Sequence, residues 1–235
     1  MDVLVKQVDL LLVRHGTTRW NREKRYLGHT DIPLDPVGRD ELAPLARELA
    51  GKAFRGVYCS DLARCRETLA IISPAHADTA MYDPPLREMD FGAWEGHTYE
   101  QLQHEPLYRQ WIDSPQQVTP PGGESWADFA GRVDGFIGSL LKDVEGACSR
   151  PAETQNDSEA VLSRSEGTEG IGPESPVHPE MLIVAHGGVL RQLAVSFVPG
   201  LSFWDVHVQP GSLLRIRLSF SEETGGWNGM LVNEA

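Results

Sequence analysis

Two short runs of aliphatic residues constrain the fold of this chain more than any other feature. Each run leads directly into a histidine followed by glycine: "LLLVRHG" spans residues 10–16 and "LIVAHGG" spans residues 182–188. A short run that is apolar throughout is typical of a strand buried on both faces, as in a parallel sheet covered by helices. In open α/β sheets the ligand lies beyond the carboxyl ends of the strands, so we expect His15 and His186 to face one crevice. A single histidine there would more often be structural, whereas two at equivalent strand ends favour a shared site.

The rest of the chain alternates strand patterns with helical ones. Apolar spacing predicts helices over residues 33–51, 62–74, 124–142 and from residue 187 onward, and strands over residues 8–13, 56–60, 79–83, 181–186, 212–220 and 229–232. This alternation predicts an α/β fold, a three-layer αβα sandwich with a mostly parallel central sheet.

The predicted helix over residues 33–51 carries its own start and stop signals. Asp35 can cap the first turn, Pro36 suits that turn, and Gly51 follows the last apolar position. Pro44 lies inside the pattern and weakens it, because proline lacks the backbone N–H that a helix interior needs.

Composition narrows the classes of function. The net charge is −13 and no basic stripe is visible, which argues against a nucleic-acid binder and means that a few local cations must hold any bound anion. No apolar run approaches the roughly 20 residues that span a bilayer, and the N-terminus shows no signal-peptide pattern. The three cysteines form no CxxC pair, which argues against a disulfide framework or a zinc site. We therefore expect a cytoplasmic protein that binds neither nucleic acid nor membrane.

Residues 149–179 differ from the rest of the chain in composition. The segment is rich in serine, glutamate, glycine and proline and is acidic overall. It buries too little apolar surface to offset the entropy of ordering it. We predict a disordered insertion within a single domain of residues 1–235, with a linker between two domains as the alternative. The strand and helix patterns that follow it favour the single domain.

Four segments resemble the signatures of one known family. In chain order they are "RHGTTRWN", "SDLARCRETL", "LREMDFGAWEG" and "VAHGG". They are similar to the motifs of the histidine phosphatase superfamily, which includes cofactor-dependent phosphoglycerate mutases and many phosphomonoesterases. The first triplet alone is weak evidence, but four segments in the right order are specific. The resemblance implies a phosphoglycerate mutase-like fold and an enzyme that acts on a small phosphomonoester without a cofactor or a metal ion.

By this resemblance His15 is the nucleophile that attacks phosphorus and forms a phosphohistidine. Histidine suits this role because it is uncharged near neutral pH and its N–P bond hydrolyses readily. Phosphoryl transfer needs mainly positioning and charge neutralisation, so a fork of arginines can replace a metal. Arg14, Arg64 and His186 are the implied catalytic clamp on the phosphoryl oxygens. The implied phosphate-binding set is Arg14, Thr17, Asn21, Gly28, Arg64, His186 and Gly187.

Two choices between neighbouring residues rest on the resemblance. The family arginine lies four residues after the serine of "SDL", which selects Arg64 and leaves Arg66 as a surface charge. The family's general acid corresponds to Glu88, which would protonate the leaving group and then activate water. That role requires a proton on Glu88 in the first step, favoured by the substrate's negative charge or by burial. Asp90 would face the same side of an extended segment, so spacing alone does not separate the two carboxylates.

The resemblance is less specific about the roles of three other residues in these motifs. Thr17 stands where the family often has glutamate, which leaves open whether its side chain contributes to binding. Trp20 fits either the core or a pocket wall, with the core favoured. Glu95 is expected to be structural.

The composition of residues 97–125 helps to distinguish a phosphatase from a mutase. The mutases carry a longer insertion here with extra basic residues for a bisphosphate, whereas Arg109 is the only arginine in this segment and lysine is absent. This favours hydrolysis, with phosphoglycerate mutase as the alternative. Within the family, "REMDFGAWEG", "PPGGES", "HGGVLR" and "PGSLLRI" resemble the alpha-ribazole phosphatases of cobalamin assembly, or a broad-specificity relative. The implied leaving group is nucleoside-like, and four aromatic residues are available either to wall it or to form core: Trp94, Tyr99, Tyr108 and Trp111.

Two functions of other classes are also compatible with parts of the sequence. A catalytically idle protein that binds a phospho-ligand or a partner would be signalled by loss of His15, Arg64 or Glu88, and all three are present. A metal-dependent hydrolase needs carboxylates and histidines at ligand spacing. His97 and His104 do not provide it and are better explained as a solvated helix face. We expect a monomer or a homodimer.

Overall fold

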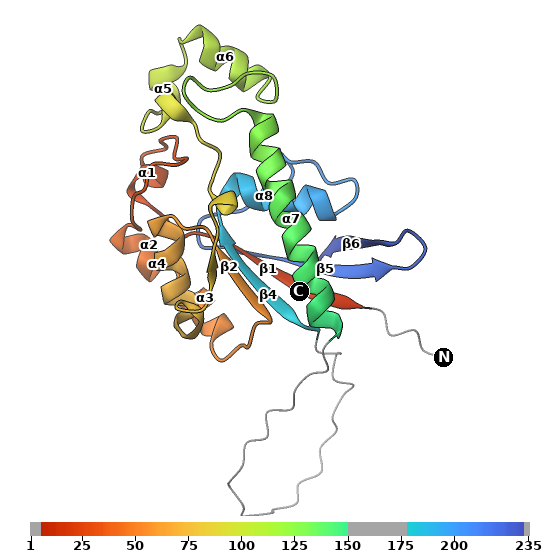
Figure 1. The fold of residues 1–235 in the computed structure, drawn as a ribbon. Helices are drawn as coiled ribbons and strands as arrows, with labels where there is room; N and C mark the ends of the chain where they lie inside the picture. The colour runs from red at the N-terminus through yellow and green to blue at the C-terminus, as the bar shows by residue number, and fades with distance from the viewer. Residues whose placement is uncertain (1–5, 150–177, 233–235) are drawn as a thin grey trace, which may run out of the picture.

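A computed structural model describes residues 6–149 and 178–232 of the chain (Figure 1). The strands are β1 (Gln7–Arg14), β2 (Gly56–Cys59), β3 (Met81–Tyr82), β4 (Glu180–Ala185), β5 (Leu213–Ser221) and β6 (Gly226–Leu231). The α-helices are α1 (Arg19–Arg22), α2 (Pro36–Asp40), α3 (Ala43–Leu49), α4 (Ala63–Ile72), α5 (Tyr99–Leu102), α6 (Pro106–Asp113), α7 (Trp126–Ser149) and α8 (Gly187–Phe197). Short 3₁₀ helices are η1 (Pro74–His76), η2 (Pro84–Leu86) and η3 (Gly92–Trp94).

A six-stranded sheet with the order β3-β2-β4-β1-β5-β6 forms the centre of the fold. The pairs β1–β4, β4–β2 and β2–β3 are parallel, whereas β5 and β6 are added antiparallel at the other edge. The predicted α/β fold with a mostly parallel sheet is therefore confirmed. β1 has a neighbour on each side and helices on both faces, which explains why its run is apolar throughout.

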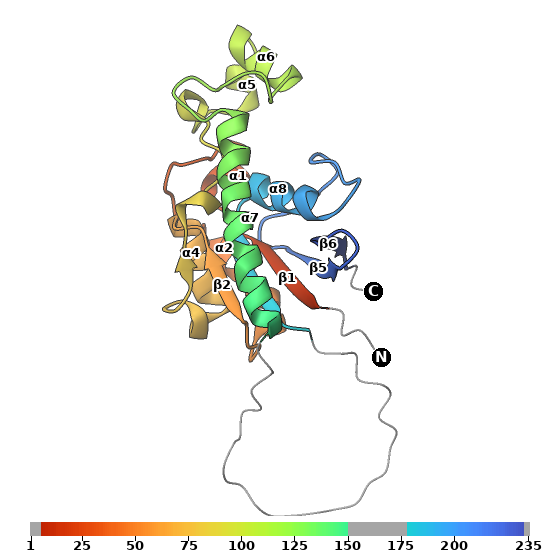
Figure 2. The ribbon, with the colours of Figure 1, turned by 45° about the vertical axis from the view of Figure 1, so that its right-hand side comes forward.

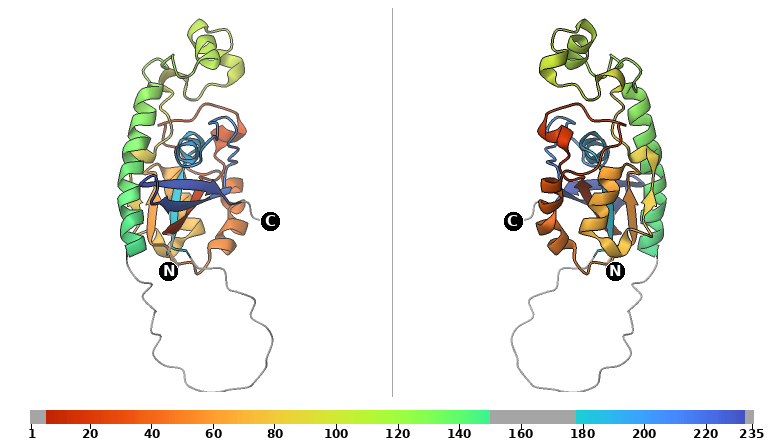
Figure 3. Two further views of the ribbon diagram at one scale, coloured as in Figure 1. Left: turned by 90° about the vertical axis from the view of Figure 1, so that its right-hand side faces the viewer. Right: turned by 90° about the vertical axis from the view of Figure 1, so that its left-hand side faces the viewer.

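Successive side chains of β1 point to opposite faces of the sheet. Val8, Leu10 and Leu12 pack in one core with residues of α7 and α8, while Leu11 and Val13 pack in a second core with residues of α3 and α4. Figure 3 shows α7 along one flank of the sheet and the helices of residues 36–49 on the opposite flank. The helices on both faces make the three predicted layers.

The prediction of one helix over residues 33–51 is wrong. α2 ends at Asp40, the chain restarts as α3 at Ala43, and Pro44 occupies the first turn of α3. In that turn proline costs no hydrogen bond, whereas in a continuous helix it would remove one and clash with the preceding turn. The start signal is confirmed, because the Asp35 carboxylate accepts a hydrogen bond from the Val37 amide at 3.0 Å.

α7 is longer than predicted and ends at Ser149 instead of residue 142. The insertion predicted at residues 149–179 lies, apart from residues 149, 178 and 179, outside the described part of the chain. Both the insertion and the single-domain boundary therefore stay predictions. Among residues 6–149 and 178–232, no helix has the length and apolar character needed to cross a bilayer.

Residues 91–125, which we call the cap, project beyond one end of the sheet with α5 and α6 (Figure 2). Trp94, Leu102, Tyr108 and Trp111 are buried together in a small core of their own. This arrangement places three of the four candidate aromatic walls inside the cap. Tyr99, the fourth, is 43% exposed on its surface.

Candidate active site

His15 follows the last residue of β1 and is buried. Its Nδ1 lies 2.8 Å from the carbonyl oxygen of Gly16. Because a carbonyl only accepts hydrogen bonds, Nδ1 carries the proton, and the lone pair of the neutral ring lies on Nε2. The Gly16 amide in turn donates to Thr68 Oγ1 of α4 at 3.0 Å, which fixes the turn after the strand.

His186 lies next to His15 because β4 pairs with β1. Arg14 is opposite Ala185 in the parallel register, and each histidine is the next residue in its chain. The two rings meet edge to face with centroids 5.1 Å apart. The predicted meeting of the two histidines at one sheet edge is therefore seen in the structure.

Three side chains contact the nitrogens of the His186 ring, the weakest contact being Cys65 Sγ at 3.5 Å from Nε2. Arg64 Nε lies 3.3 Å from Nδ1, and Ser60 Oγ lies 2.9 Å from Nε2. An arginine nitrogen only donates, so Nδ1 accepts and Nε2 carries the proton, which it donates to Ser60. His186 is also the N-cap residue of α8, although its side chain makes no capping hydrogen bond.

Two arginines provide the local cations that an acidic protein needs to hold an anion. Arg64 is fully buried, and its guanidinium also donates to the carbonyls of Thr30 at 3.0 Å and Gly28 at 2.6 Å. Arg14 donates from Nη1 to the Val208 carbonyl at 2.7 Å, while its buried Nε has no hydrogen-bond partner among the described residues. An unpartnered buried donor is uncommon and is consistent with a site built to receive an acceptor.

Burial is the main cause that lowers the pKa of His15 well below its ordinary value, and the charges of Arg64 and Arg14 lower it further. The pKa of His186 is lowered well below its ordinary value in the same way, by burial and then by Arg64. Both rings are therefore neutral at physiological pH, which is the state a nitrogen nucleophile requires.

The Glu88 carboxylate reaches the N-terminus of α8. It accepts hydrogen bonds from the Gly188 amide at 2.9 Å and from the Met89 amide at 3.1 Å. A Cβ on residue 188 would lie 2.3 Å from Glu88 Oε1, so only glycine permits this approach. Asp90, the alternative carboxylate, instead accepts from the Gly92 amide at 2.8 Å and lies 3.6 Å from His29 Nδ1.

The other predicted phosphate-binding residues have local roles in the structure. Asn21 Oδ1 accepts from the Thr18 amide at 3.0 Å in the capping box of α1, and Thr17 Oγ1 donates to Glu41 at 2.8 Å. Gly28 supplies a carbonyl to Arg64, and a Cβ there would lie 2.3 Å from Glu95 Oε1. A Cβ on Gly187 would lie 3.3 Å from Arg14 Cζ. Gly28 and Gly187 thus adjoin the arginines, whereas no hydrogen bond in the described residues joins Thr17 or Asn21 to the histidine pair.

Arg66 and Glu95 have the structural roles that we expected of them, outside the histidine pair. The Arg66 guanidinium stacks 4.6 Å over the ring of Tyr82, away from the histidines. The Glu95 carboxylate accepts from the amides of His29, Thr30 and Phe91 at 2.7, 2.7 and 3.2 Å, which ties the loop after Gly28 to the cap.

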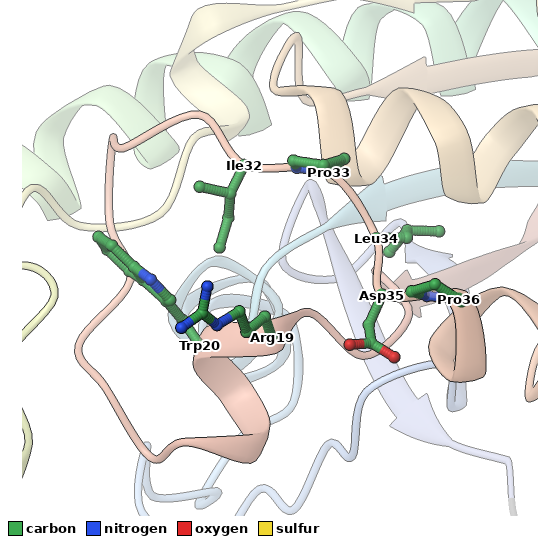
Figure 4. A pocket seen from close by; sticks show the side chains of 7 residues that line it. All are labelled: Arg19, Trp20, Ile32, Pro33, Leu34, Asp35 and Pro36. Atoms are coloured by element: carbon green, nitrogen blue, oxygen red, sulfur yellow. The ribbon is translucent and has the colours of Figure 1, made fainter.

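Trp20 is half-buried and lines a pocket of about 320 Å³ beside α1 (Figure 4). Its walls are Arg19, Trp20, Ile32, Pro33, Leu34, Asp35 and Pro36. None of the predicted catalytic or phosphate-binding residues is among them, so this pocket is separate from the histidine pair. Within the described residues, no three histidine, cysteine, aspartate or glutamate side chains form a group suited to a metal ion.

Sequence reasoning missed the residues that hold the site together. Ser60 orients His186, Thr68 orients the turn after His15, and Arg132 of α7 binds the loop that carries Glu88. Thr68 lies four residues after Arg64 on α4, which is helical spacing, and Ser60 is the serine of "SDL", so both were visible in "SDLARCRETL". Arg132 carried no comparable local signal.

The central sheet brings two neutral histidines, the buried Arg64, the half-buried Arg14 and the Glu88 carboxylate close to the N-terminus of α8, an arrangement typical of proteins that transfer phosphoryl groups. The chain belongs to the histidine phosphatase superfamily, because the model for its branch 1 matches residues 10–148. The predicted family is thereby confirmed.

Individual relatives point to two activities. The "Probable phosphoglycerate mutase GpmB" of Salmonella choleraesuis (strain SC-B67) is 33% identical over 146 residues, 61% of this chain and 67% of that protein. The crystal structure of the alpha-ribazole phosphatase from Shigella flexneri aligns with a TM-score of 0.71 at 25% identity, covering 96% of each chain. The crystal structure of TTHB049 from Thermus thermophilus aligns with a TM-score of 0.60 at 30% identity, covering 88% of this chain and 92% of that one. Family membership therefore leaves phosphatase and mutase chemistry both open.

Proposed function

We propose that this chain hydrolyses phosphomonoesters through a phosphohistidine on His15. One observation carries the proposal: the bond from His15 Nδ1–H to the Gly16 carbonyl leaves the Nε2 lone pair free for attack. Arg14 and Arg64 lie close enough to that ring for their charges to lower its pKa, and they would neutralise a phosphoryl group bound there.

The proposed reaction has two halves. In the first, Nε2 of His15 attacks phosphorus, the ester P–O bond breaks, and Glu88 gives its proton to the departing oxygen. In the second, the Glu88 carboxylate takes a proton from water, the water oxygen attacks phosphorus, and the N–P bond breaks. Inorganic phosphate leaves, and both residues return to their starting protonation states.

Hydrolysis is favoured over mutase chemistry by the charge of the cap. Arg109, the only arginine of residues 97–125, is exposed on α6 and donates to Tyr99 Oη at 3.2 Å. The same segment contains no lysine, so it lacks a second cation for the second phosphate of a bisphosphate. Similarity to the Shigella flexneri enzyme supports alpha-ribazole 5′-phosphate as the substrate, with a broad phosphomonoester range as the next choice.

The direct test traps the intermediate. Acid quench of wild-type protein with ³²P-labelled substrate should leave protein-bound label, and His15→Ala should leave none, while the exposed His104→Ala should label normally. Label on His15→Ala would identify another nucleophile. Unlabelled wild-type protein that still binds the substrate would support a catalytically idle binding protein.

The substrate is tested by comparing kcat/KM for alpha-ribazole 5′-phosphate, 3-phosphoglycerate, sugar phosphates and nucleotides. We expect alpha-ribazole 5′-phosphate, the nucleoside-like substrate, to have the highest kcat/KM. Phosphoglycerate mutase is the second candidate, favoured by the 33% identity to the Salmonella protein, and a mutase assay primed with a bisphosphate tests it. Isomerisation faster than hydrolysis would show that the chain is a mutase and would overturn our proposal.

The metal-free mechanism has its own test. Full phosphatase activity is expected in excess chelator, and loss of activity there would contradict the mechanism.

A further inference from the structure

Arg132, on the first half of α7, reaches the backbone of the loop that carries Glu88. Its Nη1 donates to the carbonyls of Pro85 at 2.7 Å and Arg87 at 2.6 Å, and its Nη2 donates to the carbonyl of Glu88 itself at 2.8 Å. Figure 2 shows α7 running from the cap along the sheet, so the helix is a rigid support for this contact. Three anchor points within four residues fix the backbone from which the Glu88 side chain projects.

Glu124 completes the arrangement just before α7. Its two oxygens accept from Arg132 Nε at 2.6 Å and Nη2 at 2.8 Å. Glu124 also binds the far side of the same loop, because its amide donates to the Asp90 carbonyl at 2.9 Å and its carboxylate accepts from the Asp90 amide at 3.3 Å. The pair therefore holds the loop on both sides of Glu88.

Arg132 has no donor left for a substrate. A guanidinium offers five N–H groups, and the three carbonyls and two carboxylate oxygens use all five. The exposed fractions of the two side chains are 19% for Arg132 and 14% for Glu124, so water competes little for these bonds. Lysine could not reproduce the arrangement, because it has three donors and no planar fork.

We propose that Arg132 and Glu124 are positioning residues that hold the Glu88 carboxylate against the N-terminus of α8 and thereby govern proton delivery to the leaving group. The contacts that carry this inference are the Arg132 bond to the Glu88 carbonyl and the Glu88 bond to the Gly188 amide. The inference rests on the proposed function of Glu88 as general acid. It predicts a defect specific to substrates whose leaving group needs a proton.

The kinetic test uses Arg132→Lys and Glu124→Gln with two substrates. General acid catalysis contributes roughly 10²–10⁴-fold, so we expect a loss on the order of 10-fold or more in kcat for β-glycerol phosphate. The loss for para-nitrophenyl phosphate should be much smaller, since its leaving group departs without a proton, and KM should change little. In a Glu88→Gln background, Arg132→Lys should cause no further loss on β-glycerol phosphate.

Arg217→Gln is the matched control. Arg217 forms a two-point pair with the buried Asp9 at 2.8 and 2.9 Å on the antiparallel side of the sheet. Its loss should lower stability and leave the ratio of the two substrates unchanged. Equal losses on both substrates for Arg132→Lys, or an undiminished loss in the Glu88→Gln background, would overturn the inference.

A second measurement separates this inference from the proposed function. Amide hydrogen exchange should become faster at Gly188 and Met89 in Arg132→Lys and not in Arg217→Gln, because those amides donate to the Glu88 carboxylate. This result is expected even if wild-type protein hydrolyses no phosphomonoester, in which case only the proposed function fails. Unchanged exchange at both amides would show that Arg132 does not position Glu88.

Discussion

The rings of His15 and His186 meet edge to face at an interplanar angle of 60°, yet they hold their protons on opposite nitrogens. His15 donates from Nδ1 to the Gly16 carbonyl, while His186 accepts at Nδ1 from Arg64 and donates from Nε2. Different partners on neighbouring strand ends thus select different tautomers. One ring keeps a lone pair available for attack, and the other uses both nitrogens to fix itself and Arg64.

These two histidines should make the folded state sensitive to acid. Both have a pKa well below the ordinary histidine value when folded, chiefly through burial, and regain an ordinary pKa of about 6.5 on unfolding. Below that pH the unfolded chain binds more protons than the folded one, so stability falls as the pH falls towards the folded pKa values. The slope is at most about 1.4 kcal/mol per pH unit for each histidine. Urea unfolding at a series of pH values measures it.

Variants show whether these histidines cause the acid sensitivity. His15→Gln should flatten the dependence of the unfolding free energy on pH below about 6.5, because one buried neutral imidazole is removed. His104→Gln, at an exposed position, should reproduce the wild-type curve. A wild-type slope in His15→Gln would show that other groups govern the acid response.

Arg64 and Arg66 form a matched pair for testing the anion clamp. Arg64 is fully buried and donates to His186, Gly28 and Thr30, whereas Arg66 is exposed and stacks on Tyr82. Lysine at position 64 would leave buried acceptors unpaired, so we expect Arg64→Lys to lower kcat/KM on the order of 10²–10³-fold, as for loss of one charge-stabilising donor. Arg66→Lys should stay near wild-type activity. Comparable losses in both variants would contradict the assignment of Arg64.

The parts of this fold that were predictable are those fixed by local sequence. The apolar runs before His15 and His186 specify buried strands, and parallel pairing then brings both histidines to one edge. The break between α2 and α3 was signalled by Pro44, since proline fits a first turn and not a helix interior.

Side-chain contacts between distant segments that no strand pairing brings together could not be predicted. Arg132 reaches a carbonyl 47 residues earlier in the chain, at Pro85, and nothing in the helical pattern of α7 distinguishes it from a surface arginine. The cap aromatics pose the same problem, because the sequence does not show whether Trp94 and Trp111 face a ligand or one another. Their burial follows from how α5 and α6 fold together.

The buried aromatic residues of the cap allow a test of whether Tyr108 packs in a core or contacts the substrate. Tyr108 is fully buried, and its hydroxyl lies 2.7 Å from that of Tyr26. Tyr108→Phe should lower the free energy of unfolding by about 0.5–1.5 kcal/mol, the usual net worth of one hydrogen bond, without changing the ratio of kcat/KM between nucleoside-like and simple phosphates. Tyr99→Phe, at a position 43% exposed, should change neither quantity appreciably. Altered substrate preference in Tyr108→Phe would place that ring in the binding site.

Gly188 tests the contact between Glu88 and α8 most directly. Its amide donates to Glu88 Oε2 at 2.9 Å, and an added Cβ would lie 2.3 Å from Oε1, so Gly188→Ala must displace the carboxylate. We expect slower hydrolysis of β-glycerol phosphate, on the order of the 10²-fold that a general acid contributes, with para-nitrophenyl phosphate affected much less. A stopped assay on both substrates measures this.

The control for that variant is Gly135→Ala, in the exposed face of α7, where an added Cβ meets open space. Alanine there should raise stability by about 0.5–1 kcal/mol, because glycine is a poor helix former, and should leave both activities unchanged. Both glycines lie in helices, so a difference between the two variants isolates the clash with Glu88 from the general effect of a methyl group. Wild-type rates on both substrates in Gly188→Ala would show that proton delivery does not depend on this position of the carboxylate.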